Sequence, residues 1–180
     1  MKLLGSRLHL IKQNPSEMKS PPLNEREFAC LVKEHSRIIN KVCYFYATEK
    51  IPFEDLRQEV YVNLWLSINQ FRGYSKLSSW IYRVAVNTAL MTLRSSKSKV
   101  ETASLDLRSI DISSEIDDEQ RENLQTLYNL ISRLDDIEKA IILLWLDEYT
   151  YDEIADTIGL KRNTVATKLH RIKEKLSKAI

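Results

Sequence analysis

Between Phe71 and Lys99 the chain runs for 29 residues without one acidic side chain. Six cations and four aromatic residues share this stretch: Arg72, Lys76, Arg83, Arg94, Lys97 and Lys99, with Phe71, Tyr74, Trp80 and Tyr82. Cations neutralise phosphates, and flat rings offer faces on which unstacked bases rest, at about 1–3 kcal/mol per base. This combination therefore suits a strand of nucleic acid. Trp80 and Tyr82 could equally be core aromatics, so residue type alone leaves their role open.

A second basic segment, residues 161–180, has the pattern of an amphipathic helix. Its apolar residues are spaced 4, 3 and 4 apart and share one face: Val165, Leu169, Ile172 and Leu176. Before it, Thr150 and Glu153 have the spacing of a capping box that opens a short helix, and Gly159 can end that helix. Together these signals predict a helix-turn-helix, whose second helix enters the DNA major groove. The alternative is an ordinary helix pair with a solvated basic face.

Charge is distributed in blocks, although the net charge is only +2. Residues 71–99 and 161–180 each sum to +6, whereas residues 100–122 and 123–160 each sum to −6. Two basic blocks separated by acidic sequence are expected when two surfaces contact an anion and the chain between them does not.

The composition predicts an all-α chain of two small helical domains joined by a flexible linker. Only three glycines and four prolines interrupt long patterns of 3.6-residue period. We expect a leader at 1–24, a first domain at 25–96, a linker at 97–123 and a second domain at 124–180. Fully extended, about 26 linker residues could reach ~85 Å.

Local signals place the helices of both domains. Asn24 with Glu27 predicts a first helix start, and Asp135 or Asp136 can cap a helix in the second domain. Further helices should start near Pro52–Asp55 and at Ser78 or Ser79. Three buried stripes are expected in the first domain: Phe28, Leu31, Val32, Ile38, Ile39, Val42 and Phe45; Leu56, Val60, Leu64 and Ile68; Ile81, Val84, Ala85 and Leu93.

The residues that enzymes and metal sites need are sparse, so we expect no enzyme, no cofactor and no metal. The glycines, Gly5, Gly73 and Gly159, form no phosphate-binding loop, and the histidines, His9, His35 and His170, are scattered. Cys30 and Cys43 lie without neighbouring ligand spacing. The longest apolar run is far shorter than the ~20 residues of a membrane span. Two cysteines fit a reducing compartment, so we expect a cytoplasmic protein.

Two segments together resemble a known family. DLRQEVYVNLW followed by FRGYSKLSSWIYRVAVN resembles the second conserved region of bacterial sigma factors, and IEKAIILLWLDEYTYDEIADTIGLKRNTVATKLHRIKEKL resembles their fourth. The small size and bare linker resemble the extracytoplasmic-function (ECF) class. The resemblance covers roughly residues 25–97 and 124–180.

The resemblance implies a sigma factor that binds core RNA polymerase and directs promoter recognition, DNA melting and transcription initiation. Residues implied to dock on the β′ clamp helices are Asp55, Gln58, Glu59 and Trp65. Those implied to bind the single strand of the −10 element are Arg72, Lys76, Trp80, Arg83, Asn87 and Arg94. Those implied to read the −35 element are Arg162, Asn163, Thr164, Thr167, Lys168 and Arg171. Further implied partners are the β flap, promoter DNA and an anti-sigma factor.

The linker length agrees with this implied function. The two promoter elements lie ~17 base pairs apart, which is ~58 Å along the duplex. The predicted reach of the linker exceeds that distance, so one chain could serve both elements. Two rival functions stay open at this stage. One is a helix-turn-helix regulator that binds duplex operators without polymerase, and the other is a helical adaptor with no nucleic-acid role.

Overall fold

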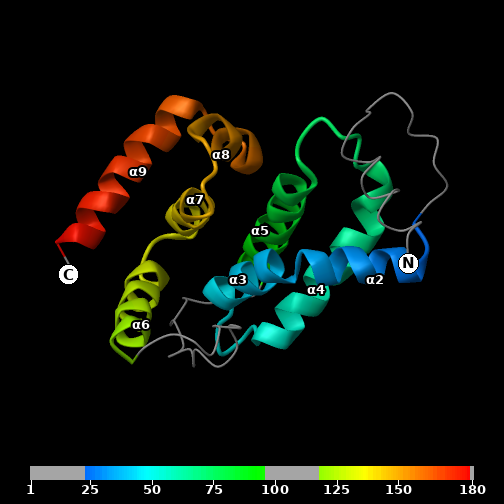
Figure 1. Ribbon diagram of the computed structural model, residues 1–180, viewed down its shortest axis with the longest axis horizontal. Helices are drawn as coiled ribbons and strands as arrows, with labels where there is room; N and C mark the ends of the chain where they lie inside the picture. The colour runs from blue at the N-terminus through cyan, green and yellow to red at the C-terminus, as the bar shows by residue number, and fades with distance from the viewer. Residues whose placement is uncertain (1–22, 96–117, 179–180) are drawn as a thin grey trace.

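The computed structural model describes residues 23–95 and 118–178, and both ranges are helical (Figure 1). The first range holds α2 (Glu25–Glu34), α3 (Ser36–Tyr46), α4 (Phe53–Ser67), the 3-10 turn η1 (Ile68–Gln70) and α5 (Leu77–Ser95). The second holds α6 (Asp118–Ser132), α7 (Asp136–Leu146), α8 (Tyr151–Ile158) and α9 (Arg162–Ser177). The predicted all-α fold is confirmed. The expected leader lies almost wholly, and the expected linker largely, outside the described residues.

Three of the described helices begin with a reciprocal capping box, in which the side chain of each partner accepts a hydrogen bond from the backbone N–H of the other. The pairs are Asn24 with Glu27, Asp135 with Glu138 and Thr150 with Glu153. Each box satisfies two backbone donors that a helix start leaves without an intrahelical acceptor. The starts predicted at Asn24 and Thr150 are thus confirmed, and Asp135 rather than Asp136 caps α7.

The apolar stripe expected between Phe28 and Phe45 is divided between two helices. His35 ends α2 and begins α3, with φ −105° and ψ 14°. Leu31, on one side of this break, and Ile39, on the other, are both completely buried. The apolar pattern therefore marks the buried side correctly while missing the change of direction between the helices.

The first core forms where α3 and α4 pack against α5. The predicted α4 stripe is buried, with Leu56, Val60 and Leu64 at most 1% exposed. On α5, Ile81 and Ala85 are also completely buried. α4 ends at Ser67, before Gly73, and the turn η1 leads into the loop that carries Gly73.

In the second half, α7, α8 and α9 share a core and α8 with α9 forms the expected helix-turn-helix. Gly159 ends α8 with φ 73°, in the left-handed region where glycine is favoured. α9 begins at Arg162, after Lys161, whose side chain makes no capping bond. Its buried face is the predicted one: Val165, Leu169 and Ile172 are completely buried.

The two halves pack against each other through α3 and α5 on one side and α6 to α8 on the other. The rings of Tyr44 and Phe45 lie 5.8 Å and 5.2 Å from that of Tyr128, measured between centroids. Lys41 forms an ion pair with Asp147. The described halves therefore form one closed arrangement, which the sequence did not predict.

Candidate nucleic-acid interface

The loop between η1 and α5 lines a cavity of about 590 Å³. This volume lies within the roughly 300–1,000 Å³ of typical small-molecule sites. Gly73 has φ 73° and turns the chain, and Tyr74 is 83% exposed. The lining combines aromatic, hydroxyl and cationic side chains: His35, Phe71, Gly73, Tyr74, Ser75, Lys76, Leu77 and Ser78. Such a lining can hold a flat ring beside a phosphate.

The aromatic residues of the basic stretch divide between core and surface. Tyr82 is completely buried, and burial raises the pKa of its phenol well above 10. Trp80 is half-buried, with its ring centroid 5.5 Å from that of the buried Phe71. Tyr82 is therefore a core aromatic, whereas Trp80 keeps one part of its ring at the surface near the loop.

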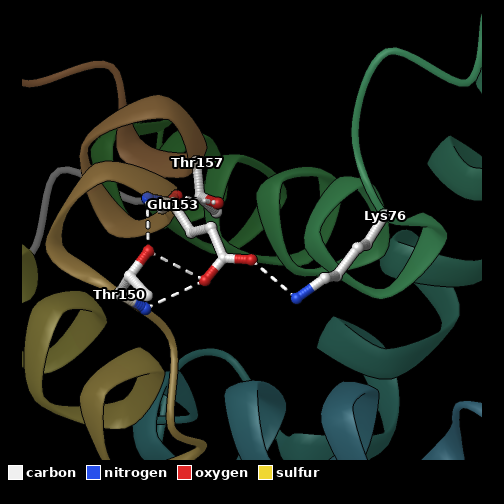
Figure 2. Close-up of polar contacts among 4 residues, drawn as sticks. All are labelled: Lys76, Thr150, Glu153 and Thr157. Atoms are coloured by element: carbon white, nitrogen blue, oxygen red, sulfur yellow. Dashed lines mark hydrogen bonds and ion pairs between the residues drawn. The ribbon is translucent and has the colours of Figure 1, made fainter.

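Lys76 lies at the rim of the cavity and pairs with the helix-turn-helix half. Its Nζ is 2.7 Å from Oε1 of Glu153, the acid of the α8 capping box (Figure 2). Glu153 Oε2 also accepts hydrogen bonds from the backbone N and the hydroxyl of Thr150, both at 2.9 Å. The bond from Lys76, and then those from Thr150, lower the pKa of Glu153 to about 2. The bond to Glu153 raises the pKa of Lys76 in turn.

Arg83 contacts the C-terminal end of α8. Its Nε donates to the carbonyl oxygen of Thr157 at 3.1 Å, and its Nη2 donates to that of Asp156. The last carbonyls of a helix lack intrahelical partners and carry the negative end of the helix dipole. A guanidinium is thus a favourable partner for this end of α8.

The other residues proposed for the single strand are accessible. Arg72, Asn87 and Arg94 are all exposed. The structure therefore places Lys76 among the residues that line the cavity, whereas Trp80 packs on the lining residue Phe71 and Arg83, Asn87 and Arg94 lie further along α5. In this closed arrangement, Lys76 and Arg83 both contact α8.

The exposed face of α9 carries most of the residues proposed to read duplex DNA. Asn163, Thr164, Thr167 and Arg171 are exposed, and Lys168 is half-buried. Arg162 differs, because its Nε lies 3.3 Å from a carboxylate oxygen of Asp152 and its guanidinium lies over the ring of Tyr151. The side chain of Arg162 is thus directed toward α8 rather than away from the protein.

The residues proposed to bind polymerase share an exposed surface of α4. Asp55, Gln58, Glu59 and Trp65 are all exposed, and the ring of Trp65 packs edge-on against Phe28 at 5.0 Å. Sequence reasoning missed two apolar residues on this surface, Val62 at 52% and Leu66 at 66% exposure. The sequence could have indicated these two residues, because they are apolar and lie outside the buried α4 stripe.

Neither a metal site nor a membrane span is found in the part of the chain that the structure describes. No group of three potential ligands among His, Cys, Asp and Glu gathers within residues 23–95 and 118–178. None of the helices in these ranges combines the length and the apolar character needed to cross a bilayer.

Two family models match the two halves in the order that the motifs indicate. Residues 31–99 match sigma-70 region 2, and residues 124–176 match sigma-70 region 4. The chain belongs to the sigma-70 family, in its ECF class. Among curated relatives, the ECF RNA polymerase sigma factor SigW of Bacillus subtilis is 26% identical over 95% of this chain and 97% of the relative. The ECF RNA polymerase sigma-E factor of Haemophilus influenzae is 24% identical over 87% of this chain and 89% of its own.

Solved structures show the same fold for this sigma-70 family member. CnrH in complex with the cytosolic domain of CnrY has a TM-score of 0.61 at 18% identity, and covers 98% of this chain and 94% of that one. The sigma factor RpoE in complex with the anti-sigma factor NepR from Bartonella quintana has a TM-score of 0.67 at 17% identity, and the match covers 86% of this chain and 96% of that one.

Proposed function

We propose that this chain binds core RNA polymerase and directs it to promoters, where it recognises the −35 element, melts the −10 element and starts transcription. The observation that carries the proposal is the pair of sigma-70 regions, in order, on one chain. The alternative of a regulator that binds operators without polymerase is not favoured, because region 2 has no counterpart in a plain helix-turn-helix protein. The chain itself performs no covalent chemistry and works in the cytoplasm.

The work is divided between a region 2 domain at residues 25–96 and a region 4 domain at residues 124–180, joined by residues 97–123. In the region 4 domain, α9 enters the major groove of the −35 element. Asn163 and Arg171 are exposed and can each bond bidentately to a base edge. The hydroxyl of Thr167 donates to the carbonyl of Asn163 at 2.9 Å, so Thr167 contacts DNA mainly through its methyl group.

In the region 2 domain, the cavity beside the loop takes a base that has left the duplex. Tyr74 supplies an exposed ring face, and Lys76 and Arg72 supply charge for the flanking phosphates. Holding an unpaired base compensates the cost of unstacking it, which is a few kcal/mol. Binding at this cavity therefore favours the melted promoter over the closed duplex.

The exposed face of α4 docks on the β′ clamp helices. It combines the acids Asp55 and Glu59 with the apolar side chains of Val62, Trp65 and Leu66. Exposed apolar side chains rimmed by charge are typical of protein interfaces. We also propose an anti-sigma factor as a partner, because both structural neighbours are bound to proteins of their own.

Run-off transcription with purified core polymerase tests the function directly. The chain should bind core polymerase in a pull-down and enable transcripts from a cognate promoter that core polymerase alone does not make. A chain that binds a duplex operator tightly by itself and shows no affinity for core polymerase would instead be a regulator of the plain helix-turn-helix type.

Permanganate footprinting tests the assignment of the cavity. The double variant Lys76→Ala with Trp80→Ala should reduce the reactivity of melted thymines more than it reduces closed-complex formation. Met91→Ala is the control, since Met91 also lies on α5 and is 69% exposed but is not a cavity residue. A melting pattern like that of the wild type would reject the assignment.

A further inference from the structure

We propose that Phe28 on α2 is a positioning residue for polymerase docking, because it holds the ring of Trp65 in place as an apolar anchor of the exposed α4 face. The inference rests on the proposed function. It adds α2 to a docking surface that the proposed function places on α4 alone. The contact between the rings of Phe28 and Trp65 carries it.

Trp65 differs from the other two apolar side chains of the α4 face in its exposure and in its aromatic partner. Val62 is 52% and Leu66 is 66% exposed, whereas Trp65 is 39% exposed. The ring of Trp65 packs edge-on against Phe28, with centroids 5.0 Å apart and planes at 77°. This is the edge-to-face geometry that aromatic pairs prefer. One part of the Trp65 ring is therefore held by α2, while another part stays accessible to a partner.

The helix that carries Phe28 is fixed at both sides of that residue. α2 begins with the capping box of Asn24 and Glu27. Leu31, three residues after Phe28, is completely buried. Phe28 itself is half-buried and packs against the same core. The orientation of the Trp65 ring is therefore set by two helices that are fixed to one core, and not by α4 alone.

A ring that is already held in the free chain favours binding. Tryptophan is enriched among the residues that dominate the energy of protein interfaces. Association normally costs the rotamer freedom of each side chain that becomes immobilised, and this cost is smaller for a side chain that is fixed beforehand. Phe28 should thus strengthen docking through Trp65, without any contact of its own with polymerase.

The affinity of the full chain for core RNA polymerase tests this role, measured by competition with a labelled wild-type chain. Phe28→Leu should raise the Kd roughly two- to tenfold, which is the worth of one edge-to-face aromatic pair. Phe28→Tyr keeps the ring and should bind as the wild type does. Phe28→Met, whose flexible side chain also fills the space of the ring, is a second variant with the same expected result as Phe28→Leu.

Phe53→Leu is the matched control. Phe53 is also half-buried, and it lies on α4, but its ring faces the guanidinium of Arg57 at 5.2 Å and not Trp65. The same change of side chain should therefore leave the affinity for core polymerase as in the wild type. If Phe53→Leu weakens binding as much as Phe28→Leu does, general loss of packing explains both, and the proposal is overturned.

The Trp65→Ala background separates positioning from a merely structural role or from direct contact. If Phe28 acts through Trp65, Phe28→Leu should raise the Kd of the wild type but cause no further rise once Trp65 is alanine. An equal rise in both backgrounds would mean that Phe28 acts independently of Trp65. No rise in the wild type would mean that Phe28 does not affect docking. Either result overturns the proposal.

Fluorine NMR of the free chain labelled with fluorotryptophan tests the ring contact itself. The chain has three tryptophans, and the Trp65 signal is the one that Trp65→Ala removes. Phe28→Leu should shift this signal and leave those of Trp80 and Trp145 in place. An unchanged Trp65 signal would show that the two rings do not pack in solution, which overturns the proposal.

Failure of this inference differs from failure of the proposed function. A wild-type chain that shows no affinity for core polymerase would reject the proposed function, and the inference with it. A wild-type chain that binds core polymerase, together with a Phe28→Leu chain that binds equally well, would overturn the positioning role alone.

Discussion

The ammonium group of Lys175 on α9 lies 2.6 Å and 2.8 Å from the two carboxylate oxygens of Glu138 on α7. Glu138 is only 7% exposed and also serves as the acid of the α7 capping box. A buried carboxylate needs a partner because removal from water disfavours its charge. This ion pair therefore connects α9 to the start of α7.

Lys175→Ala should lower the free energy of unfolding by about 1–3 kcal/mol, because it leaves the Glu138 carboxylate without its cation. Urea unfolding of the full chain measures the loss. Lys178→Ala is the control, since Lys178 is exposed at the end of α9 and should change stability by no more than about 0.5 kcal/mol. Adding Glu138→Gln to Lys175→Ala should restore part of the loss, and no restoration would contradict the role of the buried charge.

Gly159→Ala should destabilise the chain by about 1–2 kcal/mol through the backbone alone. A Cβ at this position would meet no atom within 4 Å, so the cost comes from φ 73° and not from a clash. Gly159→Asn should cost less, because Asn adopts the left-handed region more readily. Thermal unfolding of the two variants compares them, and equal losses would argue for a cause other than backbone strain.

Sequence reasoning succeeded where the determinants are local. The capping pairs Asn24–Glu27 and Thr150–Glu153 lie three residues apart, so their spacing predicts both helix starts. The glycine that ends α8, Gly159, and the apolar spacing of α9 are also local signals. The division at His35 was missed because the apolar pattern continues across the break and carries no proline or glycine signal.

The contacts between the halves could not be predicted, because nothing in the local sequence encodes them. Lys76 and Glu153 are 77 residues apart, and each has an adequate local interpretation as an exposed cation or as a capping acid. The aromatic residues show the same limit. Tyr82 and Trp80 differ in burial only because α5 packs on α3 and α4 in one particular rotation.

Arg171→Ala should weaken binding of the holoenzyme to duplex DNA that contains the −35 element, and should reduce the slope of log affinity against log salt by about 1. Lys173→Ala is the matched control on the same helix. The Nζ of Lys173 lies 3.8 Å from the ring centroid of Trp145, so that ammonium is held against the protein. Arg171→Ala should therefore change the slope more than Lys173→Ala, and equal slopes for the two variants would remove Arg171 from the reading face.

Titration of Glu153 reports whether the halves are closed in solution. Its pKa should be about 2 in the wild type, against an ordinary value of 4.5, because Lys76 and Thr150 both bond the charged form. The stabilisation from this carboxylate is thus fully present above pH 4.5 and is lost as the pH falls toward 2. Carboxyl carbon chemical shifts of glutamate-labelled protein follow the titration residue by residue.

Lys76→Ala should raise the pKa of Glu153 in that titration, while the bonds from Thr150 keep it below 4.5. Thr150→Ala should also raise the pKa of Glu153, because it removes the hydrogen bond from the Thr150 hydroxyl, and should leave the ion pair with Lys76 in place. If the wild type and Lys76→Ala titrate at the same pH, Lys76 is not paired with Glu153 in the free chain. The Lys76 ammonium would then be accessible in the free chain, whatever the other contacts between the halves do.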